Sequence, residues 1–137
     1  MRLAFILGLI FVVAGVSGAR CGSDDGAETP GGDVTLVDAP IDELEIIVRE
    51  SAPPQYAARV VSGLPNGCAQ FVDVELLGRA GNRITYRVQN SMPSDPQTVC
   101  TAIYGTHEET FELGSDFTPG SEYVVQVNDK EVSFTAQ

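Results

Sequence analysis

The side chains that could do chemistry in this chain are one histidine, a few neighbouring carboxylates and three cysteines. His107 lies beside Glu108 and Glu109, and no nucleophile elbow occurs that could complete a Ser–His–Asp device. Neighbouring residues of a strand point to opposite faces, so Glu108 and Glu109 would not flank one bond as a glycosidase pair does. Asp73 and Glu75 share a face of their strand, where solvated acids are the ordinary case. We therefore expect no catalytic residue and no enzyme activity.

The sequence also lacks the spacings that hold metals, nucleotides or nucleic acid. No C-x-x-C pair occurs, and His107 is the only histidine. Asp24-Asp25 and Ser115-Asp116 offer oxygen ligands, but neither matches a calcium-binding loop. The net charge of -11, from 19 acidic against 8 basic side chains, is wrong for binding nucleic acid or anionic lipid. We expect no metal, no cofactor and no nucleic-acid partner, and the acidic balance favours solubility.

The three cysteines divide into a pair and a single residue. Cys68 and Cys100 lie in the part of the chain with a regular apolar pattern, whereas Cys21 lies near the N-terminus. Thiols tend to pair in the oxidising compartments that exported proteins meet, and an odd number leaves one over. We expect a Cys68–Cys100 disulfide closing a loop of about 30 residues. Cys21 then needs a separate role.

The first twenty residues are typical of a secretory signal. Arg2 supplies a positive start, and residues 3–16 form an uncharged apolar run. This run is shorter than the roughly 20 residues that a transmembrane helix needs, and small residues follow it. We expect residues 1–20 to be a signal peptide and the protein to be exported.

Two cleavage sites compete after this run. Cleavage after Gly18 or Ala19 would release a soluble secreted or periplasmic protein. Residues 17–21, however, resemble the lipobox of bacterial lipoproteins, which implies that Cys21 is lipidated and anchors the chain in the cell envelope. Gly and acidic residues follow directly, as in the spacers of surface lipoproteins. We expect residues 21–41 to be a disordered acidic tether, with no other contact to a membrane.

From residue 42 onward, apolar and polar residues alternate with the period of β-strands. The clearest strand covers residues 83–89, and it forms a hairpin with the run before it. The other runs lie near residues 44–49, 56–61, 71–77, 98–104, 107–113, 123–127 and 132–136. About seven or eight short strands at this spacing, with no helical stretch, predict an all-β, antiparallel β-sandwich over residues 42–137.

The segment of residues 113–127 resembles the region before the penultimate strand of fibronectin type III domains. The matching residues are the turn at Pro119 and Gly120 and Tyr123 at the start of an alternating strand. The resemblance implies an immunoglobulin-like sandwich. It also implies that the Tyr123 hydroxyl contacts an upstream backbone group, as in a tyrosine corner.

A second resemblance covers residues 60–71, 100–105 and 113–117. Together they resemble an uncharacterised module of bacterial secreted proteins and lipoproteins, which implies export and the same fold but no particular activity. We expect a monomeric, non-enzymatic, lipid-anchored binding module of the cell envelope, with an unknown protein or glycan as its ligand.

Recognition should fall on the loops, because strands hold loops rigid. The candidate loops cover residues 62–67, 90–97 and 115–120, and the candidate contact residues in or beside them are Leu64, Pro65, Asn66, Pro93, Asp95, Asp116 and Phe117. One alternative is a small secreted protease inhibitor that presents residues 63–68, pre-organised by the disulfide at Cys68. Another is a passive structural module without a ligand.

Overall fold

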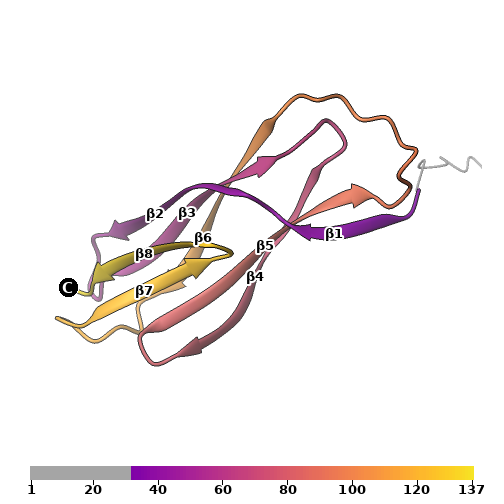
Figure 1. Ribbon diagram of the computed structural model, residues 1–137. Coiled ribbons are helices and arrows are strands. Elements are labelled where there is room, and N and C mark those ends of the chain that lie inside the picture. Colours follow the sequence, from indigo (N-terminus) through magenta and orange to yellow (C-terminus); the bar gives the residue numbers. More distant parts are fainter. Residues whose placement is uncertain (1–31) are drawn as a thin grey trace, which may run out of the picture.

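The computed structural model describes residues 32–137 of the chain. The regular secondary structure of these residues consists of eight β-strands (Figure 1). The strands are β1 (Val34–Asp38), β2 (Ile41–Arg49), β3 (Gln55–Leu64), β4 (Gln70–Ala80), β5 (Arg83–Pro93), β6 (Gly105–Gly114), β7 (Glu122–Val127) and β8 (Lys130–Thr135). The all-β prediction is confirmed. Within these residues, no helix is long and apolar enough to cross a membrane. The expected signal peptide, Cys21 and the first part of the expected tether lie outside the described residues.

The strands form two sheets that pack face to face as a sandwich. One sheet has the order β2-β3-β6 and is antiparallel throughout. The other has five strands around β5, with β4 on one edge of β5, β1 and β7 on the other edge, and β8 beyond β7. Figure 1 shows β4 and β5 as a long hairpin that runs along the length of the domain.

Two strands share one edge of β5. β7 pairs with the first part of β5, from Arg83 to Tyr86, and β1 pairs with the last part, from Gln89 to Pro93. The β7 pairing is parallel, so the prediction of a wholly antiparallel sandwich is wrong at this pair. The reason is the crossover: the chain leaves β5, adds β6 to the other sheet and returns, and it therefore runs in the same direction as β5.

The core lies between the sheets and follows the predicted alternation of β5. Ile84, Tyr86 and Val88 are buried and pack with Val60 of the opposite sheet and Val125 of β7. A second, aromatic cluster lies at the end where the chain terminates, and its members are Tyr56, Tyr123 and Ala136 with Phe117, Phe134, Leu113 and Ile46 packed against them. Burial of large apolar side chains of this kind contributes about 1.5–3 kcal/mol each.

The folded domain begins earlier than the sequence predicts. Residues 34–38, placed in the disordered tether by the sequence analysis, form β1, and Ala39 and Ile41 are buried in the core. The tether prediction is therefore wrong for residues 34–41. The strand forms because Val34 and the residues after it are strand-prone, and the last part of β5 leaves an edge free for them.

Strand β4 does not present one regular apolar face. Its pairing with β5 shifts register between Phe71 and Asp73 and again between Leu76 and Gly78. Such bulges bend an edge strand and turn side chains away from the core. Val72 and Leu76, which a regular alternation would put on the same face as Val74, are 44% and 57% exposed.

Candidate functional site

Cys68 and Cys100 form the predicted disulfide, with Cα atoms 5.5 Å apart. The bond joins the β3–β4 loop (residues 65–69) to the β5–β6 loop (residues 94–104). We call these two loops the loop end of the sandwich (Figure 1). Beside the disulfide, the Gly67 N–H donates to the Thr101 carbonyl at 2.9 Å. The two loops are so close that a Cβ atom on Gly67 would lie 2.0 Å from the Thr101 hydroxyl oxygen. The disulfide and this contact fix the long loop on the short one.

The β3–β4 loop is shorter than predicted. Gly63 and Leu64 continue β3 and pair with β6, so the expected turn begins only at Pro65. Leu64 is half-buried, and the Asn66 side-chain oxygen accepts hydrogen bonds from the N–H groups of Cys68 and Ala69 at 3.0 and 3.2 Å. Pro65 alone among the candidate residues of this loop is exposed. The structure therefore does not present residues 63–68 as a protruding segment.

The β5–β6 loop is the exposed part of the loop end. Pro93 is the last residue of β5, and the Asp95 carboxylate accepts a hydrogen bond from the Gln97 N–H at 2.8 Å, which closes a turn. The strand predicted for residues 98–104 is wrong. Its composition suits a strand, but the disulfide holds it against another loop instead of beside a strand edge.

Large apolar side chains gather on this loop and beside it. Val99, Ile103 and Tyr104 are 94%, 70% and 52% exposed, and Val34 and Leu36 of the neighbouring β1 are 60% and 50% exposed. The start of β1 lies at this end of the sandwich. There the Ser94 N–H donates a hydrogen bond to the Asp33 carbonyl at 2.9 Å. The sequence pattern does not indicate these residues as contact residues, because it predicts a strand over residues 98–104 and a tether over residues 21–41.

Tyr104 ties the long loop to the body of the domain. Its hydroxyl donates to the Asp42 carboxylate of β2, at 2.9 Å from Oδ1, and this hydrogen bond raises the pKa of the Tyr104 phenol. The ring also covers Gly63, where a Cβ atom would lie 1.8 Å from the Tyr104 hydroxyl oxygen. The loop is therefore held at two points, by the disulfide and by this phenol.

The third candidate loop, residues 115–120, lies at the opposite end of the sandwich (Figure 1). Phe117 packs against Tyr56 and Tyr123, with ring centroids 5.0 and 4.8 Å apart, and the Arg79 guanidinium covers its ring at 5.1 Å. Phe117 is therefore packed against the aromatic core with part of its side chain exposed, and its role as a contact residue stays a prediction. Asp116 is exposed there, and its carbonyl accepts a hydrogen bond from Arg79 at 3.1 Å.

The same loop contains the contact expected of Tyr123. The Thr118 N–H donates to the Tyr123 hydroxyl oxygen at 2.9 Å, and this hydrogen bond lowers the pKa of the Tyr123 phenol. The turn at Pro119 and Gly120 brings the chain back, with Gly120 at φ +83°, a conformation that glycine adopts without strain. Pro119, Gly120 and Tyr123 thus organise the start of β7.

His107 lies near the start of β6, and its side chain is packed against the opposite sheet. Its ring stacks on Phe71 of the opposite sheet, with centroids 3.9 Å apart, and its Nε2 lies 3.3 Å from a Glu109 carboxylate oxygen. The other face of β6 carries Glu108, as alternation requires. The Glu108 and Glu109 carboxylates are thus engaged separately.

The carboxylates of β4 are also engaged. Glu75 accepts a hydrogen bond from Arg87 at 2.6 Å, and Asp73 accepts one from the Val74 N–H at 2.7 Å. Among the described residues, no three His, Cys, Asp or Glu side chains are arranged to hold a metal ion.

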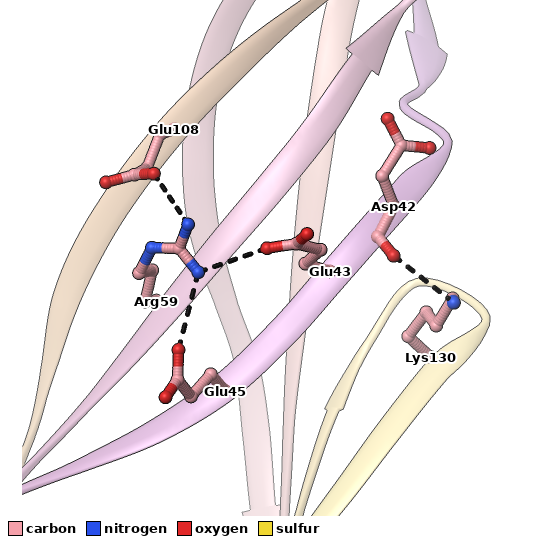
Figure 2. Close-up of polar contacts among 6 residues, drawn as sticks. All are labelled: Asp42, Glu43, Glu45, Arg59, Glu108 and Lys130. Carbon is pink, nitrogen blue, oxygen red and sulfur yellow. Dashed lines mark hydrogen bonds and ion pairs between the residues drawn. The ribbon is translucent and has the colours of Figure 1, made fainter.

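An arginine gathers the acidic side chains on the outer face of β2, β3 and β6 (Figure 2). Arg59 of β3 lies between Glu108 of β6, at 2.8 Å, and Glu43 and Glu45 of β2, at 3.2 and 3.4 Å. Hydrogen bonds to Glu108 and then to Glu43 raise the pKa of the Arg59 guanidinium. All four side chains are open to solvent to some degree, so the cluster neutralises local charge and contributes little to stability.

The comparisons agree with this architecture. Residues 58–136, more than half of the chain, match the family described as the ORF11 beta-sandwich domain, and the chain belongs to that family. It is similar to an uncharacterized 10.2 kDa protein in the HgiCIIM 5' region of Herpetosiphon aurantiacus, with 29% identity over 89 residues. The match covers 65% of this chain and 90% of the relative. No solved structure matches.

Proposed function

We propose that the protein is a non-enzymatic, exported binding module whose contact surface is the loop end. The observation that carries this proposal is the gathering of Val99, Ile103 and Tyr104, all exposed, on a loop held by a disulfide. Several large apolar side chains that stay exposed on one loop favour contact with another protein. A loop that is already fixed loses little conformational entropy on binding, which favours affinity.

The disulfide supports export. Structural disulfides persist in oxidising compartments and are rare where thiols are kept reduced. We propose that Cys21 anchors the chain to the cell envelope through a lipid, because it is the cysteine outside the disulfide and follows the expected signal segment. The mass of the mature N-terminus in a membrane fraction tests this. Acylated Cys21 is expected, and a mature terminus at Ala19 or Arg20 would make the protein soluble.

A relation to fibronectin type III domains has one observation for it and one against it. The Tyr123 contact with the Thr118 N–H supports the relation. The parallel pairing of β5 with β7 departs from the antiparallel sheets of that class. A binding role at the loop end needs only a β-sandwich with loops at its ends, and it needs no relation to fibronectin type III domains.

Photo-crosslinking in the native cell tests the proposed contact surface. A photoreactive amino acid at Val99 is expected to give a discrete adduct with one partner. The matched control places it at Ser133, an exposed residue of β8. Adducts at Ser133 with the same pattern and yield, or none at Val99, would overturn the proposal. The partner identified by the Val99 adduct should no longer bind a protein that carries Val99→Asp and Ile103→Asp. This double variant should remain folded.

A further inference from the structure

A groove on the outer face of the five-stranded sheet is separate from the loop end. It has a volume of about 550 Å³, and its lining includes Asp38, Pro40, Leu77, Arg87 and Asp129. The groove exists because β1 and β7 share one edge of β5 without meeting. The pairing of β7 stops at Tyr86, and that of β1 begins at Gln89.

The floor of this groove is fixed by Asn128, in the turn between β7 and β8. Its side-chain oxygen accepts from the Val88 N–H at 3.0 Å, and its amide nitrogen donates to the carbonyls of Ala39 and Val88 at 2.8 and 2.9 Å. Its φ of 49° lies in the left-handed region that asparagine tolerates. The Asn128 side chain thus makes hydrogen bonds to β5 in the gap where neither β1 nor β7 pairs with it. These bonds hold the floor of the groove in place without a ligand.

The groove continues along β5. A neighbouring hollow of about 370 Å³ has Leu77 and Thr85 in common with it, and Arg79 and Arg83 also line it. Leu77 lies at a register shift of β4 and is 51% exposed, so it forms an apolar wall between the two hollows. Because the charged residues of the second hollow are both arginines, a cationic group fits the first hollow and not the second.

The lining of the groove includes two carboxylates that form no ion pair with another described residue. Asp38 and Asp129 are both exposed, and neither forms an ion pair within residues 32–137. Arg87, the cation in the lining, is held at 2.6 Å by Glu75. The two aspartates lie next to the apolar surface of Pro40 and Leu77. A ligand that complements both features has an amine at the end of an apolar stem.

We propose that this groove binds a lysine side chain of an extended basic segment in a partner protein. The ammonium group lies between the Asp38 and Asp129 carboxylates, and the methylene stem packs on Leu77 and Pro40. The net charge of -11 speeds the approach of a basic segment to the protein. The proposal does not depend on the loop end.

Binding of a defined probe to the full chain tests the groove. The probe is a fluorescein-labelled peptide with alternating lysine and leucine, measured by anisotropy, and its acetyl-lysine counterpart is the ligand control. Asp38→Asn combined with Asp129→Asn should weaken binding about tenfold. Asp33→Asn combined with Asp116→Asn changes the net charge equally, but these residues are outside the lining, and it should weaken binding less than about twofold.

Two further measurements keep the test decisive. Leu77→Ser should also weaken the lysine peptide, whereas a charge-only interaction would be insensitive to it. Hydrogen exchange of the complex should show protection in residues 85–87 and 126–129. Equal weakening by both aspartate pairs, equal binding of the acetyl-lysine peptide, or protection confined to the loop end would overturn the proposal.

Discussion

Asn128 joins three segments through one side chain, because its amide bonds to β5 at Val88 and to the β1–β2 connection at Ala39. Asn128→Gly keeps the backbone conformation and removes only these side-chain bonds, which leaves part-buried backbone groups without partners. We expect the free energy of unfolding in urea to fall by about 2 kcal/mol.

Asn82→Ala provides the matched control for this substitution. The Asn82 side chain donates one exposed hydrogen bond, to the Glu122 carbonyl at 2.8 Å. Its loss should lower the free energy of unfolding by less than about 1 kcal/mol. Equal effects of Asn128→Gly and Asn82→Ala would mean that Asn128 does not hold the junction.

Ionisation of the Tyr104 phenol should make the stability of the protein vary with pH in the alkaline range. Its phenol donates to Asp42, which raises its pKa above the ordinary value of 10.0. A raised folded-state pKa adds stability that is fully present below the unfolded pKa and is lost as pH rises through the folded value. The stability difference between the wild type and Tyr104→Phe should therefore disappear above that pH.

Spectrophotometric titration at high pH checks this directly. The absorbance difference between the wild type and Tyr104→Phe reports ionisation of the Tyr104 phenol alone. Its midpoint should lie above 10.0 and move down in Asp42→Asn. A midpoint unaffected by Asp42→Asn would show that the Asp42 carboxylate does not raise the pKa of the phenol in solution.

At the scale of elements, the disulfide should matter most to the β5–β6 loop. It closes a separation of 32 residues, for which chain entropy gives a stabilisation of about 3–4 kcal/mol. Cys68→Ala combined with Cys100→Ala should lower the free energy of unfolding by this amount and speed hydrogen exchange in residues 94–104. Exchange in β7 and β8 should change only in proportion to global stability. Cys21→Ala, which removes the remaining cysteine, should leave the exchange of this loop unchanged.

The sequence predicts an element well where one side of a strand is buried along its whole length. The alternation of Ile84, Tyr86 and Val88 therefore identifies β5 and its inward face correctly. Residues 98–104 have the same strand-prone composition, but a strand also needs a neighbour, and the disulfide places them elsewhere. β1 is the converse case. The segment follows acidic, glycine-rich sequence, but it forms a strand because the last part of β5 offers it a free edge.

The candidate sites were harder to predict than the strands because they combine distant residues. Asp38 and Asp129 line one groove although they are far apart in the sequence, and the groove depends on where β1 and β7 stop along β5. The exposure of Val99 likewise follows from the fold, since its residue type indicates burial. Composition excluded several kinds of partner, but the surfaces that remain could be located only in the folded molecule.

At the scale of the whole molecule, β1 is the first strand of the described domain, and truncation tests whether the domain needs it. The described contacts of the domain start at Asp33, whose carbonyl accepts the Ser94 N–H. Removing residues 1–32 should change the free energy of unfolding by no more than about 0.5 kcal/mol. Removing residues 1–40 also removes β1, frees the edge of β5 and takes the Ala39 carbonyl from Asn128, so a loss of at least about 2 kcal/mol is expected in urea. Equal stability of the two truncated chains would place the start of the domain at β2, and the groove between β1 and β7 would then lose one of its walls without consequence for the fold.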